Sequence, residues 1–87
     1  MSYLLVRHKV HDIEEWKAVF DSHEESRARA GIRTRFLFSN VDDPSEIVLL
    51  FEASDMTKVR AFGASRALKD VIQYGGVVGD PDFSYLE

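Results

Sequence analysis

Three histidines, all in the first third of the 87-residue chain, are the side chains best suited to acid–base chemistry near neutral pH. His23 follows Trp16 and Phe20 at helical spacing, so we expect its ring to point inward at the end of an aromatic crevice. A histidine there could act as a general base or hold a polar ligand. The alternative is a structural histidine, partly buried and bonded to a backbone carbonyl or a carboxylate.

His8 alternates with Leu4 and Val6, so it shares their face of a strand and could face a cavity or an interface. It is a second candidate base, and a purely structural role is again the alternative. His11 lies just before a helix start, where we expect it to be solvated. Because His8 and His11 are three residues apart on a strand, their side chains point to opposite faces, and we expect no metal site.

Two arginines could bind an anionic substrate. Arg33 and Arg35 share the polar face of an expected edge strand, and the alternative pairs them with carboxylates across a dimer, such as Glu46 or Glu52. The charged run 24–29 is typical of a solvated helix face held by local ion pairs.

The composition excludes several classes of function. A net charge of −4 gives no electrostatic support to nucleic-acid binding. The absence of cysteine excludes disulfides, thiolate metal sites and cysteine nucleophiles. The longest apolar stretch, 47–51, is too short to cross a bilayer, and the N-terminus lacks a signal-peptide pattern, so we expect a cytoplasmic protein. A hydrophobic content of 45% suits one folded domain over residues 1–87.

Hydrophobic periodicity and turn residues predict the elements that position these side chains. Asp12 and Asp55 each precede a helical pattern as N-caps, and Gly31 and Gly75 follow as stops. The first helix should run to Ala30 along a stripe that contains Trp16, Phe20, His23 and Arg27; the second should break at 63–65. Strands are predicted at 2–10, 32–39, 46–53 and 83–86, the last after a turn at 79–81. The order βαββαβ predicts an α+β, ferredoxin-like fold, with a four-stranded antiparallel sheet, helices on one face, and the first and third strands central.

Two helices cover only one face of such a sheet. The other face would expose one of two apolar sets, either Leu4 and Val6 with Leu49 and Phe51, or Tyr3 and Leu5 with Val48 and Leu50. Soluble monomers rarely tolerate an apolar patch of that size. We therefore expect a homodimer through sheet-to-sheet packing, against the alternative of a monomer whose C-terminal segment covers the open face.

Four segments together resemble small bacterial proteins of the dimeric α+β barrel superfamily, of the antibiotic biosynthesis monooxygenase-like or cyclase-like kind. They are Leu5–Val10, Trp16–His23, Phe38–Pro44 and Gly76–Asp82. The resemblance implies a homodimer with facing sheets and a ligand cavity between helices and sheet. It also implies oxidation of phenols by oxygen without a metal or flavin cofactor. The haem-degrading branch of the superfamily has a first-strand asparagine and a second-half histidine, both of which this chain lacks.

Three hypotheses follow. The first is a cofactor-independent monooxygenase-like or cyclase-like enzyme for a small aromatic or polyketide-type substrate, with His23 or His8 as the base and Trp16, Phe20 and Phe62 as pocket walls. The second is a non-catalytic dimeric protein that binds a small ligand or responds to stress. The third is a structural dimer whose crevice is filled by its own side chains. A void of about 300 Å³ or more beneath the aromatic residues would admit a ligand and argue against the third.

Overall fold

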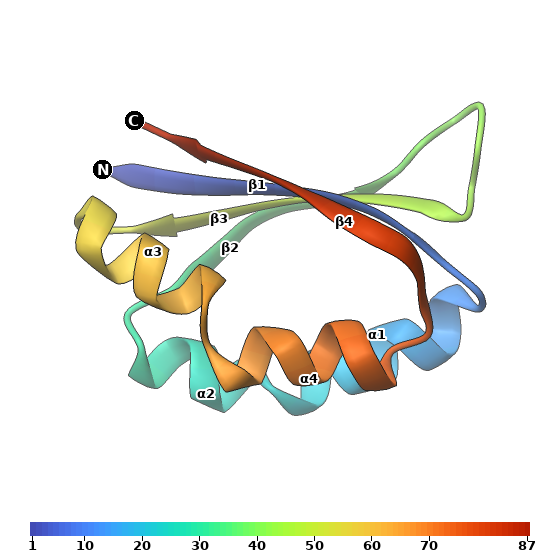
Figure 1. Ribbon diagram of the computed structural model, residues 1–87, viewed down its shortest axis with the longest axis horizontal. Helices are drawn as coiled ribbons and strands as arrows, with labels where there is room; N and C mark the ends of the chain where they lie inside the picture. The colour runs from blue at the N-terminus through green and yellow to red at the C-terminus, as the bar shows by residue number, and fades with distance from the viewer.

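Four antiparallel strands form one sheet in the computed structural model, which describes residues Met1–Glu87, and four helices lie on one side of that sheet (Figure 1). The elements are β1 (Ser2–Val10), α1 (Ile13–Ser22), α2 (Glu24–Arg29), β2 (Arg33–Ser39), β3 (Glu46–Ala53), α3 (Met56–Gly63), α4 (Arg66–Tyr74) and β4 (Val77–Leu86). The sheet order is β2-β3-β1-β4. The predicted α+β, ferredoxin-like fold is confirmed, including the central positions of β1 and β3.

Side-chain caps begin three of the helices, as the sequence predicts for two of them. The Asp12 carboxylate accepts hydrogen bonds from the first amides of α1, and the Asp55 carboxylate accepts one from Lys58 N at 2.9 Å. The Ser65 hydroxyl accepts a hydrogen bond from the Leu68 amide and restarts the helical path as α4, which confirms the predicted break. These caps satisfy amides that a helix start would otherwise leave unpaired.

The first helical segment is divided at His23, so the prediction of one helix from Asp12 to Ala30 is wrong. His23 has φ −102° and ψ 9°, outside helical values, and it ends α1 before α2 begins. The Ser22 hydroxyl donates a 2.6 Å hydrogen bond to the Val19 carbonyl, and His23 Nδ1 lies 3.0 Å from the same oxygen. Side chains that occupy a helical carbonyl in this way compete with the backbone ladder, which is the physical reason for the break.

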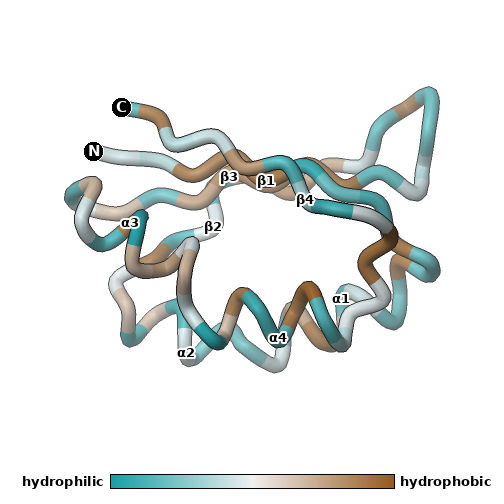
Figure 2. Tube along the Cα trace, viewed as in Figure 1, coloured by the Kyte–Doolittle hydropathy of each residue, from teal (hydrophilic) through white to brown (hydrophobic).

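The core lies between the sheet and the helices. On the central strands, Leu4 pairs with Phe51 and Val6 with Leu49, and all four are almost completely buried against the helices. Figure 2 shows brown, apolar stretches along the central strands, alternating brown and teal on α4, and a mostly teal β2–β3 hairpin with one brown band near its tip. Of the two predicted apolar sets, this one forms the core, so the set of Tyr3, Leu5, Val48 and Leu50 faces away from the helices.

A β-bulge changes which face the second half of β2 presents. The sequence alternation predicts Thr34, Phe36 and Phe38 on one side, but the pairing with β3 skips Arg35. Phe36 therefore pairs with Leu50, on the face away from the helices, and Phe38 lies on that face as well. One extra residue reverses the side-chain alternation beyond it, so the predicted single face for these residues is wrong.

β4 begins at Val77 rather than at Phe83, so the predicted short last strand is also corrected. Residues 79–81, expected as a turn before the strand, form an irregularity inside it, where the pairing with β1 shifts register between Arg7 and Lys9. Gly79 has φ +75°, a conformation that glycine adopts without strain. The irregularity absorbs the extra residues, and Val77 can then pair with Val10.

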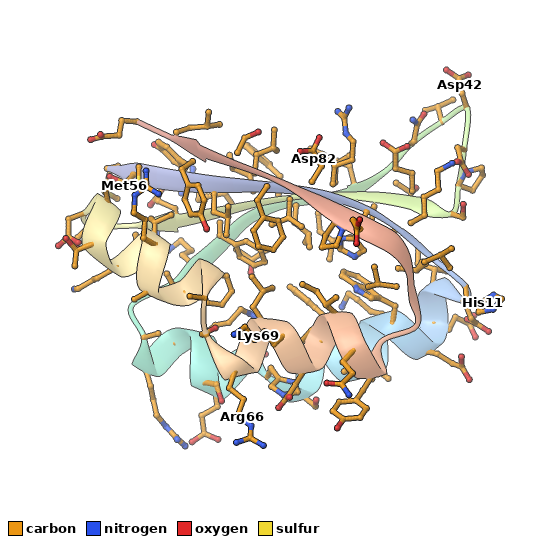
Figure 3. All side chains as sticks on the ribbon, viewed as in Figure 1. His11, Asp42, Met56, Arg66, Lys69 and Asp82 are labelled. Atoms are coloured by element: carbon orange, nitrogen blue, oxygen red, sulfur yellow. The ribbon has the colours of Figure 1, made fainter.

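No helix covers the second face of the sheet, which we call the open face. Tyr3, Leu5, Val48 and Leu50 are half-buried on it, and Phe36 and Phe38 are 48% and 59% exposed. The two phenylalanine rings stack on each other, with centroids 5.6 Å apart. In Figure 3 the Asp82 side chain also points away from the helices on this side. No helix of the chain is both long and apolar enough to span a membrane.

Candidate functional site

A small, largely enclosed cavity lies between the helices and the helix-facing side of the sheet. Twelve residues line it, nine of them hydrophobic: Val6, His8, Phe20, His23, Arg27, Leu49, Phe51, Phe62, Ala67, Leu68, Val71 and Ile72. The only polar side chains among them are two histidines and an arginine, and none is a carboxylate. The free space that a water centre can occupy is about 10 Å³, enough for about one water molecule. This void is far below the roughly 300 Å³ that would admit a ligand, so in this structure the crevice is filled by the chain's own side chains, as the third hypothesis expects.

His8 projects from β1 into this cavity and has no hydrogen-bond partner. The residue is only 5% exposed, and neither Nδ1 nor Nε2 is bonded to any protein atom. Burial lowers the pKa of His8 from 6.5 to about 4, so the ring is neutral at physiological pH. Buried polar atoms are almost always paired in folded proteins. The unpartnered ring therefore marks a place where a ligand could make a hydrogen bond.

Trp16 lies beside His8 rather than in the cavity wall. It is fully buried, its ring centroid is 5.5 Å from that of His8 and 5.0 Å from that of Phe20, and it is not among the twelve lining residues. Its Nε1–H is also without an acceptor. Phe20 and Phe62 do line the cavity, on either side of Phe51. Trp16 therefore packs against His8 and Phe20, which line the cavity, without lining it itself.

His23 lines the cavity from the junction of α1 and α2, and one of its two ring nitrogens is hydrogen-bonded to the backbone. Nδ1 lies 3.0 Å from the Val19 carbonyl oxygen, so this nitrogen carries a proton and donates it there. Nε2 lies 3.9 Å from a carboxylate oxygen of Asp70 on α4. The two candidate bases thus share one cavity, but only His8 has both ring nitrogens unpartnered.

Arg27 lines the cavity, although the charged run 24–29 to which it belongs predicts a solvated helix face. The pair of Arg29 with Glu25 at 2.8 Å fits that prediction. Arg27 itself is only 7% exposed and lies over the Phe20 ring, 3.8 Å from its centroid. The solvated assignment is therefore wrong for Arg27, because its position on the apolar stripe turns it inward. That stripe was the sequence signal for a buried cation.

The other arginines and His11 lie outside the enclosed cavity. Arg35 Nε is 3.6 Å from the buried Glu52 carboxylate of its own chain, and Arg7 Nε is 3.2 Å from Glu46. Both carboxylates proposed as partners across a dimer thus already have a partner within the chain. Figure 3 shows His11 at the corner between β1 and α1, on the outside of the molecule. No three of the His, Asp and Glu side chains lie close enough together to hold a metal ion.

An open groove adjoins the cavity on the side of α1, α2 and β2. It has a free volume of about 410 Å³ and is lined by Lys17, Phe20, Asp21, Glu24, Arg27, Ala28, Ile32, Arg33, Thr34 and Leu37. Phe20 and Arg27 line both the groove and the enclosed cavity. This stacked pair is therefore shared by the apolar cavity and the more polar open groove.

Comparison with known proteins identifies the fold. No family model and no curated protein matches the chain. A protein of Bordetella bronchiseptica provisionally named an antibiotic biosynthesis monooxygenase matches at 13% identity and TM-score 0.79, over 99% of this chain and 94% of that one. A conserved protein of Methanosarcina mazei matches at 12% identity and TM-score 0.78, over 99% and 90%. A Caulobacter crescentus protein with the same provisional name matches at 17% identity and TM-score 0.74, over 98% and 86%. The chain thus has the α+β, ferredoxin-like fold of these proteins, which is the fold that the sequence predicted.

Proposed function

We propose that the protein is a cofactor-independent, monooxygenase-like or cyclase-like enzyme that takes a small aromatic or polyketide-type substrate into the cavity between helices and sheet. The observation that carries the proposal is the His8 ring, which is buried, neutral and unpartnered in an apolar cavity. An unpaired buried ring costs stability, so a role in binding or proton transfer explains why it is there. The fold neighbours named as monooxygenases agree with this proposal at the level of fold.

His8 would act as the general base toward a phenol. The phenol O–H donates to a ring nitrogen of His8, which has no competing partner. A base with a pKa of about 4 is weak, but a phenolate beside the ring stabilises the imidazolium and so raises that pKa within the complex. The positive charge of Arg27, on the same cavity wall, also favours the phenolate.

The oxidation then balances without a further reactant. The phenolate donates two electrons to dioxygen, a C–O bond forms at a ring carbon, and His8 returns its proton to the resulting peroxide anion, which becomes a hydroperoxide. The O–O bond breaks as the ring carbon loses its hydrogen, which gives a quinone and water from one phenol and one dioxygen. His23, with its Nδ1 bonded to the Val19 carbonyl and its Nε2 near the Asp70 carboxylate, would bind a second polar group of the substrate.

Oxygen consumption with a panel of phenols and hydroquinones tests the proposal. His8→Ala should lower turnover by roughly 10²–10⁴-fold, the usual contribution of a general base. His11→Ala is the matched control, because His11 is exposed and outside the cavity. Turnover that is unchanged by His8→Ala would remove His8 as the base. Binding of a phenol with no oxygen consumption would favour the alternative, a non-catalytic ligand-binding protein.

We also propose that a second copy of the chain covers the open face by sheet-to-sheet packing. The central strands present half-buried apolar side chains there, and β2 adds the stacked Phe36 and Phe38. The rim is charged, with the Arg7–Glu46 and Lys9–Asp43 pairs. An apolar centre within a polar rim is typical of a protein interface. The cavity lies on the opposite side of the sheet, so each copy would keep its own site.

A further inference from the structure

Arg27 is a buried cation without an anionic partner. No carboxylate oxygen of the chain lies within 4 Å of its guanidinium, and its one hydrogen bond runs from an Nη1 donor to the Phe20 carbonyl at 2.8 Å. The other buried charged residue, Glu52, does have a counter-ion. Burial lowers the pKa of Arg27, while Glu24 and Asp21 oppose that shift. An arginine keeps its charge at neutral pH even so. A buried charge is normally paired, because it loses its hydration.

Arg27 lines both the enclosed cavity and the open groove, so a ligand in either space could reach its unpaired charge. Its guanidinium covers the Phe20 ring, and this pair is shared by the two spaces. The enclosed cavity holds about one water, whereas the groove has a volume of about 410 Å³. If the pair separates, the two spaces become continuous. A planar ring could then stack on Phe20 in place of the guanidinium.

We propose that the ligand of this site is a planar aromatic anion, an aryl carboxylate or a phenolate, which enters through the groove and takes the place of Arg27 on the Phe20 ring. The displaced guanidinium binds the anionic oxygens through two of its N–H groups. The ring lies among the apolar lining residues, and a polar substituent reaches His8. The inference rests on the proposed function for the location of the site. It adds that the ligand is an anion and that Arg27 is the residue that binds its charge.

The chemistry of the lining favours an anion over the alternatives. No carboxylate lines the cavity, and its lining charge is the guanidinium of Arg27, which repels a cationic ligand. A neutral aromatic ligand would fill the apolar space but leave Arg27 unpaired. Glu24 and Asp21 in the groove repel an anion, but Lys17 already holds Asp21 through bonds of 2.8 Å to both carboxylate oxygens. Glu24 is therefore the one groove carboxylate that has no bonded counter-ion.

Binding of 2-naphthoate and of its neutral isostere 2-naphthylmethanol tests the inference. Trp16 is the single tryptophan, so its indole N–H gives one resonance in a ¹⁵N-correlated NMR spectrum, next to the cavity. Titration calorimetry gives the affinities. Wild type should bind the anion more tightly, and Arg27→Met should weaken naphthoate binding about 10–100-fold, the range for hydrogen bonds to a charged group. Binding of the alcohol should change little.

Three further variants separate charge recognition from a loss of folding. Arg29→Met removes an exposed arginine of the same helix and should change neither affinity. Glu24→Gln leaves Arg27 in place and should strengthen naphthoate binding a few-fold. Arg27→Lys keeps the charge without the planar fork and should fall between wild type and Arg27→Met.

Equal binding of anion and alcohol by wild type, or equal naphthoate binding by wild type and Arg27→Met, would overturn the inference. Failure of both probes to bind would overturn this inference, whereas the proposed function stands or falls on oxygen consumption with the phenols. Arg27-dependent naphthoate binding without oxygen consumption on any phenol would support this inference and count only against the oxygenase.

Discussion

Replacing His8 by leucine should stabilise the protein, although it removes the proposed base. The ring is 5% exposed and neither nitrogen has a partner. An unsatisfied buried polar group costs about 1–3 kcal/mol, and leucine has a similar volume without polar atoms. His8→Leu should therefore raise the free energy of unfolding at pH 7 by about 1–3 kcal/mol. The lower end applies if one water in the small cavity satisfies one of the two nitrogens.

The same substitution should remove a pH dependence of stability. In the unfolded chain His8 binds a proton near pH 6.5, but in the folded chain only near pH 4. Between these values the unfolded state holds more protons, so acidification favours unfolding. Above about pH 6.5 His8 is neutral in both the folded and the unfolded chain, so its titration does not change the free energy of unfolding. As the pH falls from 6.5 toward 4, the free energy of unfolding decreases. A shift of this size corresponds to roughly 3 kcal/mol.

Denaturant unfolding at several pH values between 7 and 4 measures both effects. The comparison uses one fixed protein concentration, because association of subunits also changes apparent stability. Subtracting the His8→Leu profile from the wild-type profile cancels the carboxylates common to both, such as Asp43, whose pKa is lowered by hydrogen bonds with Ser45 and Lys9. His11→Gln, at an exposed position, should stay within about 0.5 kcal/mol of wild type at pH 7. A His8→Leu protein that is less stable than wild type, or that keeps its pH profile, would refute the reasoning.

Two other predictions concern packing and association. A Cβ at Gly75 would overlap the Val71 carbonyl and lie 2.9 Å from Trp16 Cδ1, so Gly75→Ala should destabilise by about 1–3 kcal/mol in thermal or denaturant unfolding; unchanged stability would show that this contact is not tight. If the open face is the interface, Phe38→Asp should reduce the mass in light scattering from twice 9.9 kDa to the single-chain value. Val41→Asp, at a 95% exposed hairpin position, should not; a wild type already at the single-chain mass would exclude the dimer.

The sequence predicts the order of the elements well, because each boundary has a local chemical signal. Asp12 and Asp55 cap helices whose apolar positions repeat at helical spacing, and both strand-and-helix halves can be identified from those signals alone. The features that could not be predicted are irregularities. The bulge at Arg35 adds one residue to a strand without changing its composition. Nothing local distinguishes a bulged strand from a regular one, since the extra residue is defined by its partner strand.

The location of the candidate site could be predicted from the sequence, but the buried positive charge of Arg27 could not. Helical spacing placed Phe20 and His23 at the crevice, and alternation placed His8 on the helix-facing side of β1, and the structure has all three among the cavity-lining residues. Trp16 has the same spacing but is not among the cavity-lining residues. Helical periodicity predicts which side of a helix a residue faces, but not whether it reaches the cavity or is covered by other side chains. Arg27 satisfies the stripe and also belongs to a charged run. A long side chain with an apolar stem can meet both conditions, so only the three-dimensional packing shows that its guanidinium is buried.

The proposed ligand site and the proposed dimer interface lie on opposite sides of the same strand. On β1, His8 faces the cavity, whereas its neighbours Arg7 and Lys9 face the open side, where they form ion pairs with residues of β3 and the hairpin. Arg27 belongs to α2, which lies on the helix side of the sheet (Figure 1). The proposed separation of Arg27 from Phe20 would therefore take place on the side opposite the proposed sheet-to-sheet interface. A chain made monomeric at the open face should keep the naphthoate response of its tryptophan, whereas a site completed by the second copy would lose it.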